Sequence, residues 1–439
     1  MMLEVVGILA FALVILGSIA LHEMGHLIPA KRFGVKVTQY MVGFGPTVWS
    51  RQKGETEYGV KAIPLGGYIR MIGMLPPSPD DPEGRSRSMT TGRMALLVED
   101  ARRQSWEEVA PGDESRTFYR LPVRQRVIIM LGGPLMNLLL AVVLFALLLV
   151  GVGVAQPSLQ VSAVVPCTPS VEWPTGQAAP DGSCPTLPSP AAQAGLRPGD
   201  VVVAYEGQSV ASWDDMTAAI REAAGQTVVL TVLRDGSTID IDLPIAEVTR
   251  PEYDEAGQPT GGTVTSGFIG VRPEIEYVAQ PWTSVPVAIW DLTVGSAKAL
   301  VSLPVRLYEL VTETLLGGGE RSLDSPVSVV GVSRLGGEVV ASEEPFEGKV
   351  AIFLGLAASL NLFLFLFNLL PILPLDGGHV AGALYEGARR GVAKARGRPD
   401  PGPFDVARLL PVAYGVAAVL IVVGAIVIWA DLVKPITLG

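Results

Sequence analysis

Four long apolar stretches constrain this chain more than any other feature of its sequence. They run from about Val5 to Pro29, from Val127 to Val154, from about Val350 to Leu370 and from about Leu409 to Leu432. Each has the roughly 20 mostly apolar residues that a helix needs to cross about 30 Å of hydrocarbon. We therefore expect a polytopic α-helical membrane protein with four transmembrane helices.

Two apolar segments need further interpretation: residues 283–316 and the first of the four stretches. Residues 283–316 are apolar in part, but Asp291, Lys298, Pro304 and Arg306 interrupt them. We expect one or two amphipathic helices there, resting on the membrane surface. The first stretch has neither a basic n-region nor an A-x-A site, so we interpret it as a permanent helix and not as a cleaved signal peptide.

Charge predicts the orientation in the membrane. The short segment 385–403 carries five basic residues, Arg389, Arg390, Lys394, Arg396 and Arg398. By the positive-inside rule this segment and residues 31–125 are cytoplasmic, so both termini and the long acidic segment 155–349 lie outside.

The formal net charge of -10 argues against nucleic acid as a partner. The preference for Arg over Lys suggests a GC-rich bacterial genome, hence a bacterial plasma membrane.

One motif inside the first apolar stretch indicates chemistry. His22-Glu23-Met24-Gly25-His26 is an H-E-x-x-H sequence. On a helix its two histidines lie one turn apart on one face and can bind one zinc ion, while Glu23 can take a proton from a zinc-bound water. The alternative is a buried Glu–His pair that only holds helices together. It is the weaker interpretation, because two of the three histidines in the chain stand in this motif.

A catalytic zinc site needs a third protein ligand. The third apolar stretch ends in NLLPILPLDGGH, where Pro371 and Pro374 stop the helix and Asp376 offers a carboxylate at membrane depth. An interfacial Asp that merely ends the helix is the alternative. His379 is a rival ligand, but we expect it to face the cytoplasm. With four spans, Asp376 reaches the same depth as His22.

These residues resemble the site-2 protease family of intramembrane zinc metalloproteases. The matching segments are HEMGH (22–26), MVGFGP (41–46) with IPLGGYIRM (63–71), LGGPLMN (131–137) and NLLPILPLDGG (368–378). The resemblance implies that His22, His26 and Asp376 bind Zn²⁺ and that Glu23 is the catalytic base. It further implies that Asn368 holds the substrate backbone, and that residues of about 40–71 form a membrane-associated β-hairpin region. An exposed strand edge there could pair with an unwound substrate, or the hairpin could be an ordinary cytoplasmic one.

The outside segment has its own pattern. Residues 189–208 resemble a single PDZ domain, with a short helix at Pro190–Ala194, a turn before Asp200 and the strand VVVAY. A helix is expected at Asp214–Ala224, followed by a hairpin that turns at Asp235-Gly236. Such a domain could screen substrates, or serve as a lid without affinity for a ligand. Cys167 and Cys184 are the only cysteines, and an oxidising compartment favours a disulfide between them.

The chain is thus expected to divide into eight parts: transmembrane helix 1 (1–30), a cytoplasmic loop with the hairpin and a helix near Met94–Val109 (31–125), transmembrane helix 2 (126–154), an extracytoplasmic α+β PDZ-like domain (155–262), an extension with amphipathic helices (263–349), transmembrane helix 3 with the LDG motif (350–384), a cytoplasmic loop (385–403) and transmembrane helix 4 (404–434).

The function expected from the resemblance is hydrolysis of peptide bonds within or near the transmembrane segments of single-span substrates. In bacteria such substrates are anti-sigma factors or signal-peptide remnants, and a site-1 protease cuts the same substrate first. One rival hypothesis is a non-proteolytic PDZ-bearing membrane scaffold with a structural metal. Another is a metal transporter, but the second and fourth apolar stretches are nearly free of polar residues.

Overall fold

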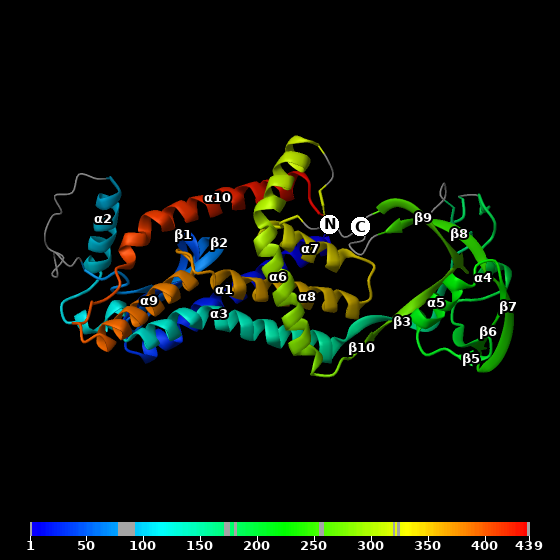
Figure 1. Cartoon of the computed structure of the whole chain (residues 1–439), viewed down its shortest axis with the longest axis horizontal. Helices are drawn as coiled ribbons and strands as arrows, with labels where there is room; N and C mark the ends of the chain where they lie inside the picture. The colour runs from blue at the N-terminus through cyan, green and yellow to red at the C-terminus, as the bar shows by residue number, and fades with distance from the viewer. Residues whose placement is uncertain are drawn as a thin grey trace. The chain divides into compact units, whose positions relative to one another are not determined.

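The computed structural model describes residues 2–77, 93–170, 176–179, 182–253, 259–318, 321–322 and 325–436. This part of the chain forms two compact units (Figure 1). The first unit joins Met1–Gly153 to Ala279–Gly439, and the second is Val154–Val278. All the long helices belong to the first unit.

Among the described residues, five helices are long and apolar enough to cross a membrane. Four of them cover the expected spans: α1 (Met2–Arg32), α3 (Val123–Ala146) with its π-helical continuation η3 (Leu147–Val152), α8 (Phe346–Asn368), and α10 (Leu410–Val433) after the 3₁₀ turn η5 (Val406–Leu409). A helix satisfies its own backbone groups, so such apolar sequences can lie in lipid as helices. The chain is a multi-pass membrane protein with an additional β-rich unit.

The fifth long helix is α6 (Ser284–Glu309), which continues as the π-helical segment η4 (Leu310–Leu316). It is a single helix where the sequence allowed one or two, and it is the least apolar of the five. In Figure 1, α6 runs across the direction that α3 and α8 follow. Val285 packs with α3 and α8, and Leu310 packs with Val427 of α10. The count of four spans stays a prediction.

The end of α8 differs from the expected boundaries. The third span was expected to run through residues 350–384, but α8 ends at Asn368 and a new helix, α9 (Asp376–Ala395), begins at the aspartate of the LDG motif. Pro371 and Pro374 have no backbone N–H to continue α8. A Cβ at Gly377 would lie 2.3 Å from the Leu370 carbonyl oxygen, so only glycine fits this turn. Residues 385–395, expected in a loop, are helical.

The expected hairpin is present as β1 (Val37–Lys53) and β2 (Thr56–Met71). Both strands bend, and the register changes several times. Residues 39–42 of β1 pair with 57–60 of β2 and also with 67–70 of β2. Since 39–42 lies between these two segments, residues 67–70 form an edge of the sheet.

Shorter helices complete the first unit. The predicted helix near Met94–Val109 is present as α2 (Arg93–Glu107), while residues 78–92 of the same predicted cytoplasmic loop lie outside the described residues. Two 3₁₀ turns, η1 (Glu114–Arg116) and η2 (Phe118–Arg120), lead into α3. The helix α7 (Val329–Ala341) packs on α1, where Gly336 meets Phe11.

The second unit is built on a sheet in the order β10-β3-β4-β6-β7, with β5 beside β4, and on a separate β8-β9 pair. The bounds are β3 (Val154–Val164), β4 (Val201–Tyr205), β5 (Gln208–Ser209), β6 (Thr227–Arg234), β7 (Ser237–Pro244), β8 (Ala246–Tyr253), β9 (Pro259–Phe268) and β10 (Val271–Val278). The sheet packs on α4 (Pro190–Gln193) and α5 (Trp213–Glu222).

Local predictions in this unit are confirmed. The strand VVVAY is β4, and Asp235 and Gly236, both at positive φ, turn β6 into β7. Cys167 and Cys184 form a disulfide. The unit extends beyond the expected boundary at residue 262, because β9 pairs with β8 and β10 pairs with β3.

Candidate metal centre

The H-E-x-x-H motif lies in the C-terminal part of α1, where the helix approaches α3 unusually closely. A Cβ at Gly25 would lie 2.2 Å from the Gly132 carbonyl oxygen, so the two helix backbones touch at glycines. This contact brings the His26 ring to α3, and its Nδ1 donates to the Ile129 carbonyl oxygen at 2.7 Å. The Nε2 atom of His26 is thereby directed away from α3's backbone carbonyl and toward His22.

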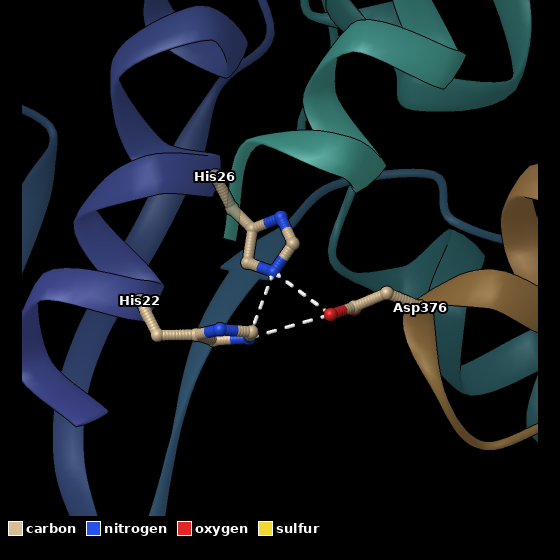
Figure 2. A group of neighbouring side chains, drawn as sticks. All are labelled: His22, His26 and Asp376. Carbon is tan, nitrogen blue, oxygen red and sulfur yellow. Dashed lines mark hydrogen bonds and ion pairs between the residues drawn. The ribbon is translucent and has the colours of Figure 1, made fainter. Parts of the chain in front are cut away.

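Asp376 comes to the two histidines from the start of α9 (Figure 2). Its Oδ2 lies 3.3 Å from the Nε2 atoms of both His22 and His26. The two Nε2 atoms are themselves 3.3 Å apart. The three atoms thus form a nearly equilateral triangle of potential ligand atoms, drawn from two segments of the chain that lie at least 350 positions apart.

The triangle has the dimensions of a zinc site. Zinc–nitrogen and zinc–oxygen distances of about 2.0–2.2 Å in a tetrahedron place ligand atoms roughly 3.3–3.6 Å apart. Two histidines and one carboxylate are also a usual ligand set for a catalytic zinc, with the fourth position left to water or substrate. The residues therefore fit a bound zinc ion.

Gly133 of α3 lies directly against this triangle. A Cβ on Gly133 would lie 2.2 Å from His26 Nε2 and 2.7 Å from His22 Nε2. Any side chain at this position would occupy the space in which the ligand atoms converge. The glycine pair of LGGPLMN thus serves both the helix contact, through Gly132, and the metal centre, through Gly133.

Glu23 lies between the metal centre and the edge of the β-sheet. Its side chain is buried, and a Cβ on Gly67 would lie 2.9 Å from Glu23 Cγ. The backbone of Ile69, on the same edge segment, lies beside the Glu23 carboxyl group. The sheet edge at residues 67–70 is therefore next to the residue expected to act as base.

Tyr40 attaches the hairpin to α1. Its hydroxyl donates to the Ala20 carbonyl oxygen at 2.6 Å. Burial, together with the nearby Glu23 carboxyl, raises the pKa of Tyr40 to about 12. The phenol therefore stays protonated and keeps donating over the pH range in which proteins work.

A buried ion-pair cluster holds α9 in place. Glu386 is fully buried; its Oε1 accepts from Arg126 of α3 at 2.5 Å and lies 3.2 Å from an Arg390 guanidinium nitrogen. Its Oε2 accepts from the Phe404 backbone N–H at 2.9 Å. Because α9 begins at Asp376, this cluster helps to fix that carboxylate against the histidines of α1.

The two other residues considered from the sequence lie outside the triangle. Asn368 is the last residue of α8 and is half-buried. His379 lies one turn along α9 from Asp376 and is not in the group of three that could hold a metal ion. Sequence reasoning did not identify Gly67, Gly132, Gly133 or Ile129 as parts of the site. The paired glycines of LGGPLMN were a signal for Gly132 and Gly133 alone, because adjacent glycines in a helix often mark a close approach.

Comparison with known proteins agrees with this arrangement. The family described as peptidase family M50 matches residues 10–399. The zinc metalloprotease Rip1 of Mycobacterium tuberculosis is 38% identical, with all of both chains covered. The metalloprotease MmpA of Caulobacter vibrioides is 29% identical over 84% of this chain and 83% of its own. The regulator of sigma-W protease RasP of Bacillus subtilis is 26% identical, covering 87% of this chain and 90% of its own.

Proposed function

The chain belongs to peptidase family M50 and is a zinc metalloprotease, and from this premise we propose that it hydrolyses peptide bonds within or near the transmembrane segments of single-span membrane proteins. The metal ligands in this proposal are His22, His26 and Asp376. The observation that carries it is the 3.3 Å triangle of their ligand atoms beside Glu23. The family assignment makes the scaffold and transporter hypotheses the weaker ones.

The geometry assigns separate roles to the bound metal, to Glu23 and to the ion pairs of Glu386. A bound zinc ion supplies Lewis-acid chemistry, by which it polarises the scissile carbonyl and acidifies water. Glu23 takes the proton from the attacking water and passes it to the leaving amine. Its burial beside Gly67 and Ile69 restricts the carboxyl group to positions near the metal centre. The ion pairs of Glu386 hold Asp376 in position during this step.

The sheet edge can pair with a substrate segment that has become extended. A transmembrane helix hides its carbonyl groups in hydrogen bonds, so a scissile bond is exposed only where the helix becomes extended. We place the extended segment along residues 67–70, where it adds as a strand next to Glu23. Asn368, at the end of α8, then holds the substrate backbone on the other side.

The direction of the helices supports the topology expected from charge. His22 and His26 lie near the C-terminal end of α1, and Asp376 follows the C-terminal end of α8. The two helices must therefore run in the same direction across the membrane, with α3 returning between them. A full crossing by α6 alone would place Asp376 at the opposite face, so four spans fit the metal centre. Both termini and the unit Val154–Val278 then lie outside the cytoplasm.

We propose the substrates and partners of this protein as classes of protein. The printed name of the Bacillus subtilis relative connects that protein with sigma-W regulation. For this chain we propose anti-sigma-factor-like proteins or signal-peptide remnants as substrates, trimmed first by a site-1 protease. The unit Val154–Val278, which includes the PDZ-like segment, screens the trimmed substrates by size or terminus.

The test is co-expression of the full chain with a candidate single-span substrate. We expect Glu23→Gln to keep zinc and to lose cleavage by at least 10²-fold, because it removes the general base. Asp376→Ala is expected to lose both zinc and cleavage. If Glu23→Gln gives the same products as the unchanged chain, the enzymatic proposal fails and the scaffold hypothesis gains support.

A further inference from the structure

Asn137, the last residue of the LGGPLMN segment, has no role in the mechanism above. Its side chain lies within α3 and only 1% of the residue is exposed. Neither Nδ2 nor Oδ1 has a hydrogen-bond partner among the described residues. A carboxamide offers two donor hydrogens and an acceptor oxygen, and leaving all of them unpaired in the interior is costly. An apolar residue at this position would cost less free energy on folding, unless the amide binds a partner.

A pair of polar side chains, Asn361 and Ser18, lies where α8 contacts α1. Asn361 of α8 is fully buried, and its Nδ2 donates to Ser18 Oγ of α1 at 3.0 Å and to the Ala357 carbonyl oxygen at 2.9 Å. Its Oδ1 has no hydrogen-bond partner among the described residues. Helix contact alone explains the bond between Ser18 and Asn361, but it does not explain the unpaired Oδ1.

Helical register brings Asn137 to the helix interface that holds this pair. On α3, Gly133 faces the histidines of α1, whereas Ala141 packs in one cluster with Leu362 of α8. Asn137 stands midway between Gly133 and Ala141, four residues from each, so it faces the interface with α1 and α8. On α8, Asn361 follows Ala357, which packs on α1, and Ala358, which packs on α3. It therefore faces the same interface.

This part of the helix interface lies one helical turn from the candidate metal centre. Ser18 precedes His22 by four residues on α1, and Asn137 follows Gly133 by four residues on α3. Because α1 and α3 run in opposite directions (Figure 1), both steps lead the same way from the contact of Gly133 with His22. One turn is about 5.4 Å along the axis.

The two histidines of the metal centre are supported unequally. His26 Nδ1 donates to the Ile129 carbonyl oxygen. His22 Nδ1 is buried and has no hydrogen-bond partner among the described residues. With Nε2 facing the metal, Nδ1 carries the ring hydrogen, and metal-binding histidines nearly always donate it to a carboxylate, a carbonyl or a water. His22 thus needs an acceptor, and side chains on a helix lean toward its N-terminus, here toward Ser18.

We propose that Asn137, Asn361 and Ser18 hold ordered water between α1, α3 and α8, and that this water accepts the hydrogen bond from His22 Nδ1. Asn137 is then a positioning residue for the zinc ligand His22. Water is the occupant that fits, because side chains exposed by 5% or less leave no passage for a peptide. A buried water needs two to four polar partners, and these groups supply them. The inference rests on the zinc ligands of the proposed function.

The experiment compares zinc affinity among full-length variants purified in detergent, by competition with a chelating dye. Asn137→Leu keeps the number and branching of the side-chain heavy atoms but removes every polar atom, and we expect about 10–100-fold weaker zinc binding. Asn137→Ser leaves a hydroxyl and room for water, and we expect its affinity to stay within about threefold. Phe145→Leu is the matched control, since Phe145 is buried on the same helix and packs against α8 without a polar atom.

Unchanged affinity in Asn137→Leu would overturn the inference. Equal weakening in Phe145→Leu and Asn137→Leu would also overturn it, since both would then act through helix packing. His22→Ala separates the premise from the inference: if this variant still binds zinc with unchanged affinity, the ligand assignment itself is wrong. Because zinc binding is measured without a substrate, a failure to cleave the chosen protein affects only the proposed function.

Discussion

At the scale of single residues, the candidate metal centre depends on glycine as much as on its proposed ligands. Gly25 and Gly132 let two helix backbones touch, and Gly133 leaves the space in which His22 and His26 converge. A helix interior is normally a poor place for glycine, because it loses more backbone freedom on folding than other residues do. Here glycine allows α1 and α3 to approach closely enough for the histidine rings to converge, and this compensates for the lost backbone freedom.

Gly133→Ala tests this interpretation. The added methyl group would lie 2.2 Å from His26 Nε2, so the ring must move and the triangle of ligand atoms must open. We expect zinc affinity to fall by about 10–100-fold, with a similar loss of cleavage. The control is Gly151→Ala, since nothing lies within 4 Å of a Cβ at that position. Zinc binding that survives Gly133→Ala would contradict the packing argument.

At the scale of elements, key side chains of both units lie at or near the ends of strands and helices. In the first unit, α9 delivers Asp376, and the sheet edge at residues 67–70 lies beside Glu23. In the second unit, Asp200 lies at the turn before β4 and pairs with Arg234 at the end of β6, with Asp200 Oδ1 2.7 Å from Arg234 Nε. Asp200 Oδ2 also accepts from the Arg197 N–H at 2.8 Å.

This ion pair predicts a pH dependence of the second unit. The hydrogen bond from Arg234 is the main cause that lowers the pKa of Asp200 below its ordinary value. A carboxyl whose pKa is lower in the folded state stabilises that state above its unfolded pKa of about 3.9, and the contribution is lost as the pH falls through the folded value. Asp200→Asn should therefore unfold more easily than the unchanged chain near pH 6, and the difference should shrink as the pH falls below about 4.

Hydrogen exchange at β4 and β6 in the full-length chain would measure this difference. Asp242→Asn is a suitable control, because Asp242 is exposed on β7 of the same sheet. A difference between Asp200→Asn and the unchanged chain that is equally large at pH 6 and at pH 3 would show that the ion pair is not its cause.

At the scale of the whole molecule, the metal centre and the membrane topology depend on each other. The proposed ligands lie near the end of α1 and at the start of α9, just after the end of α8, so α1 and α8 run in the same direction. In the proposed topology the basic segment 385–403 follows on the cytoplasmic side. The orientation can be measured directly, because the two native cysteines form a disulfide and give no background in thiol labelling.

We expect a membrane-impermeant maleimide added to intact cells to label Leu3→Cys and Ser209→Cys. Arg396→Cys should react only after the cells are opened, since it follows α9 on the cytoplasmic side. Labelling of Arg396→Cys in intact cells would reverse the proposed orientation. Protection of Ser209→Cys together with Arg396→Cys would instead show that the middle unit does not lie outside.

Several parts of this protein could be predicted from the sequence, because their causes are local. Apolar runs of about 20 residues predict long helices, and the i, i+4 spacing of His22 and His26 alone places two ligands on one face. The turn at Asp235-Gly236 and the break at Pro371 follow likewise from backbone preferences of those residues. Asp376, the third proposed ligand, could be suggested by its carboxylate at membrane depth and by family resemblance.

Other parts depended on tertiary packing, because they concern atoms far apart in the sequence. The 3.3 Å separations between Asp376 and the histidines arise from the contact of α1 with α3 and from the ion pairs that hold α9. The folded chain was also needed for three other features: the direction of α6 relative to α3 and α8, the sheet edge at residues 67–70, and the addition of β10 to the second unit. Local preferences decide which elements form, whereas only long-range packing decides which of their side chains meet.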